Sequence, residues 1–278
     1  MKLNAIQHNS GFSLLALDIL TDVADQCGSN LQTEEGKSQI EGVVATLVKE
    51  YAGTYSGVLL APEVGYTALY DKKDQSGVLF PLERRIYDAD PLTIPILKDH
   101  WGVEVIAQNY GVAKLELYYH PEEKEAATKQ QMVGELYEYC RHEGIDLLLE
   151  LVIYIQGTEA EYMAQLPSVQ LAAVQDFRSS CSLLALEYPF NALNTVTLTA
   201  ELDIPWILTA RTTPYDQFKE QLRTALESGA QGYMAGSFFL PPLPTTGTRQ
   251  WNASDVQSFI TTTGKDRAHE LYRIVSER

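Results

Sequence analysis

The sequence is short of cysteine, of basic residues and of long apolar runs, and each shortage excludes a class of protein. Its 278 residues include three cysteines, Cys27, Cys140 and Cys181, none of them in a CxxC pair. An odd, scattered set argues against a disulfide framework and a structural zinc site. Every apolar run falls well short of about 18 residues, the length that a transmembrane helix needs, so we expect no membrane span.

Basic residues are outnumbered by acidic ones. With 21 Lys+Arg and 37 Asp+Glu, the formal net charge is −16. A polyanion would be repelled, so we expect neither nucleic acid nor an anionic membrane as partner. An anionic small molecule stays compatible, because it needs only a local basic pocket. The N-terminus has no apolar signal-peptide core, and we expect a cytoplasmic protein.

Short motifs of well-known chemistry are missing too. The sequence contains no GxGxxG, GxxxxGK[ST], HExxH or GxSxG, and its five histidines show no metal-binding spacing. We therefore expect neither a metal nor another cofactor. We interpret the charged run 121–125 as a solvated helix start, whose acids suit the helix dipole.

The chain alternates short apolar runs with longer amphipathic stretches. Eight short runs are mostly apolar, as strands buried on both faces are: 12–18, 56–62, 78–82, 113–119, 146–153, 183–187, 205–210 and 232–236. Helical periodicity marks 36–51, 126–142, 159–174, 214–227 and 265–275. This alternation predicts a single-domain (β/α)8 barrel over residues 1–278. The alternative is an open doubly wound sheet, which would call for a glycine-rich phosphate loop after an early strand.

Charged residues within or after the apolar runs are the site candidates, because chemistry in such barrels collects at the carboxyl ends of strands. Lys114 and Glu116, two residues apart, face the same way, and Glu150 interrupts the fifth run. A buried charge is costly unless it is paired or hydrated, and the apolar neighbours of Lys114 and Glu150 favour an inward position for both. Residues at run ends face either the site or solvent: Asp18, Glu63, Glu187 and Arg211.

Several segments, in order, carry a family resemblance: FSLLALD at 12–18, LLAPEVG at 59–65, KLELYY at 114–119, LLE at 148–150, LALEYP at 184–189, IPWIL at 204–208 and ESGAQGYMAG at 227–236. The sequence resembles the class I ketose-phosphate aldolases of the tagatose-1,6-bisphosphate aldolase group, which includes sulfofructosephosphate aldolase. The resemblance implies a (β/α)8 barrel, reversible cleavage of a ketose phosphate and no metal.

The resemblance breaks at three places that matter for chemistry. The family uses a lysine whose imine with the substrate carbonyl accepts electrons as the C–C bond breaks, and Ala185 holds its position. The first-strand motif continues into Gln-Arg in the family and into Ile19-Leu20 here. The eighth-strand Gly-Arg, whose arginine binds phosphate, is Gly236-Ser237 here. Retained by motif match are Asp18, Glu63, Lys114, Glu150 and Glu187.

Three functional hypotheses follow. The first is a degenerate or altered class I site, with Schiff-base cleavage lost or changed. The second is an active aldolase in which Lys114 is a relocated nucleophile, Glu150 the acid/base and Asp18 a further catalytic residue. Against it, the neighbouring Glu116 favours the ammonium form of Lys114. The third is a non-catalytic barrel that binds a metabolite or a protein.

If the family's arginine is missing, the anionic group of a ligand needs hydrogen-bond donors from other residues. Arg211 follows the seventh run and is long enough to reach an anion held over Gly236 and Ser237. We expect a small polar metabolite, such as a sugar phosphate, and leave pairing into a homo-oligomer open. The expected substrate-binding residues are Glu63, Glu187, Thr209, Arg211, Gly236 and Ser237.

Overall fold

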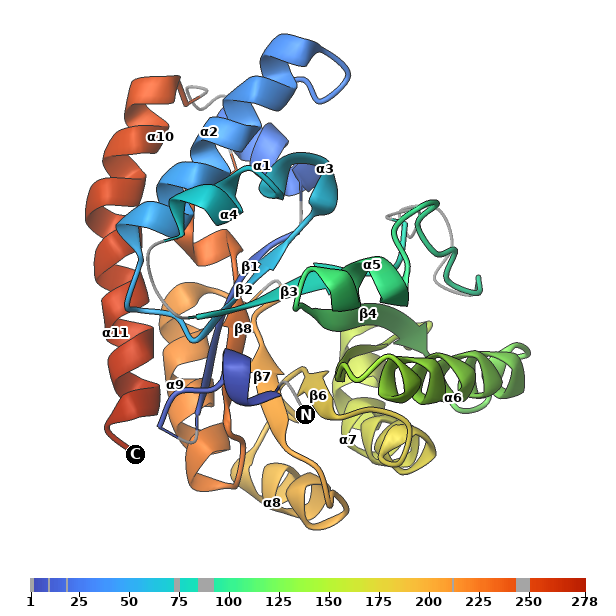
Figure 1. Cartoon of the computed structure of the whole chain (residues 1–278). Helices are drawn as coiled ribbons and strands as arrows, with labels where there is room; N and C mark the ends of the chain where they lie inside the picture. The colour runs from blue at the N-terminus through green and yellow to red at the C-terminus, as the bar shows by residue number, and fades with distance from the viewer. Residues whose placement is uncertain are drawn as a thin grey trace. The chain divides into compact units, whose positions relative to one another are not determined.

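The computed structural model describes residues 3–9, 11–18, 20–72, 76–84, 93–211, 213–243 and 251–278. Its strands, which Figure 1 labels, follow one another around a closed barrel in chain order. They are β1 Phe12–Leu17, β2 Gly57–Leu60, β3 Gly77–Pro81, β4 Val112–Tyr119, β5 Leu147–Ile153, β6 Leu183–Leu186, β7 Trp206–Thr209 and β8 Gly232–Ala235. All eight apolar runs are strands, so the predicted (β/α)8 barrel is confirmed and the open sheet is wrong.

The strands are mostly apolar in sequence because both of their faces are covered. Every residue of β1, β5 and β6 is buried, for example. In a barrel one face of a strand packs in the interior and the other packs against the surrounding helices. The pairings β1–β2, β2–β3, β4–β5, β5–β6 and β6–β7 are parallel.

Five helices correspond to the predicted helical stretches: α2 Glu34–Glu50, α6 Ala126–His142, α7 Glu159–Phe177, α9 Tyr215–Glu227 and α11 Lys265–Ser276. Local signals fix their ends. Thr158 and Glu161 form a capping box at the start of α7, and Gly229, just after α9, has a φ of +108°. The other helical segments are η1 Leu3–Ile6, α1 Leu20–Cys27, α3 Pro62–Gly65, α4 Ala68–Asp71, α5 Val103–Gln108, α8 Ala192–Ala200, η2 Ser237–Phe239, α10 Ala253–Phe259 and η3 Ile260–Gly264.

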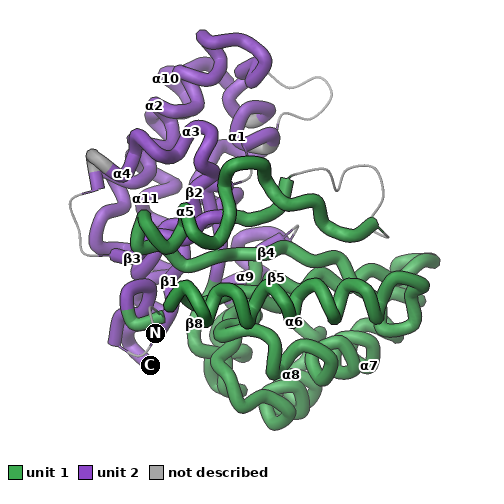
Figure 2. The backbone as a smooth tube through the Cα atoms, turned by 45° about the vertical axis from the view of Figure 1, so that its right-hand side comes forward, with its two compact units in different colours: residues 1–4, 81–209, 220–233 green, residues 5–80, 210–219, 234–278 purple. Residues whose placement is uncertain are grey.

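The chain divides into two compact units, which Figure 2 shows in different colours. Unit 1 comprises residues 1–4, 81–209 and 220–233, and unit 2 comprises residues 5–80, 210–219 and 234–278. That residues 1–278 form a single domain stays a prediction. None of the helices in the described part of the chain combines the length and the apolar character that a membrane span requires.

Within unit 1, the packing of α6 and α7 against β4 and β5 decides which side chains face the barrel interior. Tyr119, at the end of β4, packs edge-on against Phe177 of α7 with ring centroids 4.7 Å apart and donates a hydrogen bond to Asp176. Tyr119 therefore lies on the outer face of β4. Successive strand residues alternate sides, so Lys114 and Glu116 face inward.

Candidate functional site

Lys114 of β4 lies at the centre of a group of carboxylates, which we call the Lys114 cluster. Its Nζ is 2.9 Å from Glu83 Oε1, 3.0 Å from Glu150 Oε2 and 3.8 Å from Glu116 Oε2. The lysine side chain is only 1% exposed. Glu150 comes from β5 and Glu83 lies two residues after β3. Lys114 and Glu150 are buried, as their apolar neighbours in the sequence indicate, and Glu83 is a member of the cluster that the sequence analysis missed.

The strand register places Ala185 of β6 at the same level as the acids. Glu116 is paired with Glu150, and Glu150 in turn with Ala185. In-register neighbours on parallel strands point to the same side of the sheet, so the methyl group of Ala185 faces inward beside Glu150. Ala185 is 0% exposed, and this methyl group is therefore closed off from solvent.

Thr209 of β7 faces the interior one layer beyond Ala185. Ala185 is paired with Ile207, and Thr209 follows two residues later on the same side. The Thr209 hydroxyl donates a hydrogen bond of 3.3 Å to Glu150 Oε1. This bond joins β5 to β7, past the small side chain of Ala185 on the strand between them.

The charges in the Lys114 cluster determine what its amine can do. Three carboxylates around one buried ammonium stabilise its charged form, and a charged amine has no lone pair with which to attack a carbonyl. Glu150 Oε2 is close enough to accept a proton from Nζ. The geometry thus suits a cation that holds acids together, and it suits a nucleophile only after that proton is transferred.

Glu187, the other predicted site residue of unit 1, is half-buried and has defined partners. Its Oε2 accepts a hydrogen bond of 3.0 Å from the Tyr162 hydroxyl, and its backbone carbonyl accepts one of 2.9 Å from Gln170 Nε2. Both partners lie on α7, so this helix fixes the position of the residue that follows β6.

The predicted residues of unit 2 lie at strand ends, as expected. Asp18 directly follows β1 and is half-buried, and Arg211 lies two residues after β7 and is also half-buried. Glu63 is exposed in the first turn of α3. The roles of these residues, including an anion site at Arg211, stay predictions. Ile19 lies outside the described residues.

Gly236, which follows β8, has a packing reason to be glycine. A Cβ at this position would collide with the backbone carbonyl oxygen of Ala16 in β1. Only a residue without a side chain allows this approach. Ser237 begins η2 and is half-buried. The glycine is thus required by the contact with β1, whether or not an anion binds here.

Comparisons with known proteins were made for the whole chain. No family model matches it. A tagatose 1,6-diphosphate aldolase of Enterococcus faecalis is 26% identical over 255 residues, which cover 80% of this chain and 78% of the relative. One from Streptococcus pyogenes is 24% identical over 308 aligned positions that cover 99% of this chain and 94% of the relative. At 24–26% identity, the chain is similar to these two tagatose 1,6-diphosphate aldolases.

Solved structures support the fold of this chain. An archaeal fructose 1,6-bisphosphate aldolase has a TM-score of 0.66 at 14% identity, covering 100% of this chain and 98% of that one. A second structure, of an archaeal enzyme with its catalytic lysine bound to the carbinolamine intermediate, has the same score and identity and covers 99% and 98%. At this identity the likeness concerns the barrel alone.

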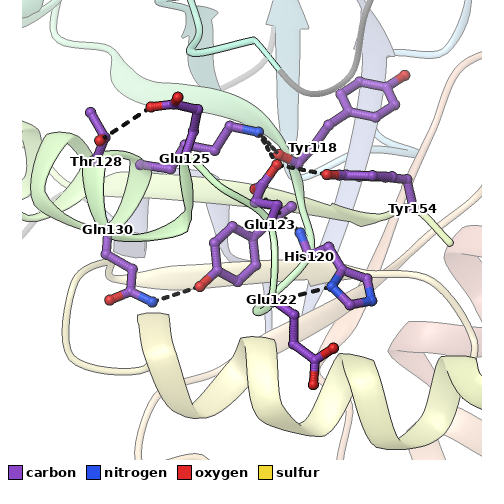
Figure 3. Close-up of polar contacts among 10 residues, drawn as sticks. Tyr118, His120, Glu122, Glu123, Glu125, Thr128, Gln130 and Tyr154 are labelled. Carbon is purple, nitrogen blue, oxygen red and sulfur yellow. Dashed lines mark hydrogen bonds and ion pairs between the residues drawn. The ribbon is translucent and has the colours of Figure 1, made fainter. Parts of the chain in front are cut away.

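A second group of polar residues surrounds Glu123, and we call it the Glu123 cluster (Figure 3). Glu123 Oε2 accepts hydrogen bonds from Lys129 Nζ at 3.0 Å and from the Tyr154 hydroxyl at 2.7 Å. Its Oε1 accepts one of 3.3 Å from the backbone N–H of His120. Lys129, 0% exposed, also donates to the carbonyl of Tyr118 at 2.9 Å.

The Glu123 cluster corrects one sequence interpretation. The run 121–125 is not a uniformly solvated helix start, because the side chain of Glu123 is 3% exposed while that of Lys124 is 94% exposed. The position of Lys129 in an apolar helical stripe is a sign of burial that the sequence interpretation missed. Lys129 shares the buried stripe of α6 with Val133, Leu136 and Cys140, where an apolar residue is expected.

The cysteines of the chain are poor nucleophiles. All three are free and buried. Burial raises the pKa of Cys27 to about 11 and that of Cys140 to about 12, and it raises the pKa of Cys181 as well. The reactive thiolate is therefore scarce near neutral pH. Among the described residues, no group of three or more His, Cys, Asp and Glu is arranged to hold a metal ion.

Proposed function

We propose that this chain is an aldolase-family barrel that has lost Schiff-base cleavage at β6 and binds a small polar metabolite, such as a sugar phosphate, without cleaving it. The observation that carries the proposal is the buried methyl group of Ala185 beside the Thr209–Glu150 hydrogen bond. The proposed setting is the cytoplasm, which the three free cysteines suit.

The proposal rests on what retro-aldol cleavage requires. Breaking the C–C bond leaves a carbanion, and a protonated imine is the electron sink that this aldolase class uses. A methyl group forms no imine. In this proposal Lys114 is a structural cation that neutralises part of the acidic cluster, and Glu150 has no imine to serve.

A trapping experiment tests the loss of the imine. The full chain is incubated with dihydroxyacetone phosphate, reduced with borohydride and analysed by intact-mass and peptide mass spectrometry. We expect the unmodified mass, and saturable binding of the same compound by calorimetry. A reduced adduct on any lysine would overturn the non-cleaving proposal.

A relocated imine on Lys114 is the second candidate, favoured by one observation: Glu150 Oε2 lies 3.0 Å from Nζ and is placed to accept its proton. In that case the adduct maps to Lys114, disappears in Lys114→Met and persists in Lys129→Met. Lys129 is the matched control because it is an equally buried lysine of the same unit, paired with Glu123.

Restoring an amine at β6 provides the converse test. In Ala185→Lys, the new Nζ would enter the interior beside Glu150 and Thr209. We expect weak imine formation with dihydroxyacetone phosphate and weak cleavage of tagatose 1,6-bisphosphate, and neither in Ala185→Met, which matches the lysine in size. A folded Ala185→Lys protein that forms no imine would contradict the idea that an otherwise competent site persists.

A further inference from the structure

A cavity of about 750 Å³ lies beyond the carboxyl ends of β4 and β5, within unit 1. Its walls are the segment 120–125 after β4, the segment 154–156 after β5, Gln165 of α7, and Thr93 and Ile94. The volume falls in the range of small-molecule sites in proteins. The cavity is not part of the Lys114 cluster, and the proposed function does not use it.

The cavity is distant from Lys114 along the strands that the two share. His120 is six residues beyond Lys114, which in an extended strand is about 20 Å. Tyr154 is four residues beyond Glu150, or about 13 Å along β5. A ligand in the cavity therefore occupies a place of its own, separate from the carboxylates around Lys114.

One wall of the cavity is aromatic and held in place. The rings of His120 and Tyr154 have centroids 6.1 Å apart and planes inclined at 54°. The Tyr154 hydroxyl is fixed by its hydrogen bond to Glu123, whose carboxylate is held in turn by Lys129 (Figure 3). His120 Nδ1 accepts a hydrogen bond of 3.2 Å from the backbone N–H of Glu122. The neutral ring then carries its proton on Nε2, as a donor.

The charges of the lining disfavour an anion. Among the described residues that line the cavity, Lys124 is the one lysine or arginine, against the acids Glu122, Glu123 and Glu125. Lys124 extends into solvent and pairs with Glu125 at 3.4 Å. A phosphate would meet carboxylates here without a positioned cation, which costs electrostatic energy.

We propose that this cavity binds an uncharged, polyhydroxylated ligand of the chemical class of a free hexose. Carboxylate oxygens of Glu122 and Glu125 accept from hydroxyl groups, and the amides of Gln156 and Gln165 both donate and accept. The His120 and Tyr154 rings supply the apolar surface on which the C–H face of a sugar packs.

The binding test uses the full chain and a panel of D-tagatose, D-fructose and D-galactose, followed by saturation-transfer NMR and titration calorimetry. We expect saturable binding of at least one hexose, and we expect fructose 6-phosphate to displace that hexose at least tenfold less effectively than fructose does. We also expect dihydroxyacetone phosphate not to displace the hexose, even if it binds elsewhere on the chain. Absence of hexose binding, or displacement of the hexose by the phosphate ester as readily as by fructose, would overturn the proposal.

Variants locate the bound sugar. The double variant Gln156→Ala/Gln165→Ala changes two exposed side chains and should leave the fold intact, while weakening hexose binding about tenfold through lost hydrogen bonds. Tyr154→Leu should weaken it further. Tyr139→Leu is the matched control, since Tyr139 also donates to a glutamate, Glu104, but lies outside the cavity lining. Unchanged affinity in the double variant would refute this location.

Discussion

The Lys114 and Glu123 clusters have central charges of opposite sign. In the Lys114 cluster, one buried cation faces three carboxylates, those of Glu83, Glu150 and Glu116. In the Glu123 cluster, one buried anion receives hydrogen bonds from Lys129, Tyr154 and the N–H of His120. Two of those three donors are neutral, whereas all three acceptors around Lys114 are acids.

The contrast distinguishes a structural ion pair from a candidate functional site. A buried pair whose charges cancel and whose hydrogen bonds are satisfied fixes the position of α6 on the barrel. A surplus of acid inside a barrel costs folding free energy, and such costs are typical of functional sites or their descendants. Under the proposed function, the Lys114 cluster is what remains of a catalytic centre, whereas the Glu123 cluster supports a wall of the cavity.

Removal of the two buried lysines should give the largest difference. Lys114→Met leaves three carboxylates close together, and we expect a loss of about 4–5 kcal/mol in the free energy of unfolding. Lys129→Met leaves Glu123 with two neutral donors and should cost about 3 kcal/mol. Urea unfolding measures both, with Lys124→Met as the solvated control. A larger loss in Lys129→Met than in Lys114→Met would reverse the comparison.

Neutralising one acid in each cluster should give the next largest effect. Glu123→Gln weakens three hydrogen bonds to a charged acceptor, and we expect it to cost about 2 kcal/mol. Glu116→Gln removes the most distant carboxylate of an acid-rich group, so the unfolding free energy should stay within about 0.5 kcal/mol. Thermal unfolding at neutral pH measures the loss of stability in both variants. Equal losses would contradict the excess of negative charge that we assign to the Lys114 cluster.

The smallest expected effect concerns two tyrosine hydroxyls. Tyr154→Phe removes a donor from the buried carboxylate of Glu123, and we expect about 1 kcal/mol of destabilisation. Tyr139→Phe removes a donor from exposed Glu104 and should leave stability unchanged within error. Chemical denaturation of both variants decides the matter. A silent Tyr154→Phe would mean that the hydroxyl does not stabilise the cavity wall.

The strands were predictable because burial on both faces leaves short, mostly apolar runs, and all eight were found within two residues of their observed ends. Lys114 and Glu150 were predictable because apolar neighbours flank each charge. Helix α8 was missed because its residues, ALNTVTLTA, are rich in threonine and lack the charged face that marks an amphipathic helix.

Glu83 and Lys129 could not be assigned with the same ease, because their roles depend on contacts between distant segments. Glu83 stands between Leu82 and Arg84, outside any apolar run, and meets Lys114 only when β3 and β4 are brought together. Lys129 interrupts an apolar helical stripe, but its acceptors come from the loop and strand before α6. Sequence pattern locates a buried charge more readily than it locates the partner.

The contact between Gly236 and β1 bears on how mutational scans of this protein should be interpreted. Because any side chain at position 236 would push against the carbonyl of Ala16, a saturation library should show nearly complete intolerance there. That intolerance would look like the signature of a ligand-binding residue, although its origin is a steric exclusion between two backbone segments. Fitness data at this position therefore report on barrel assembly rather than on chemistry.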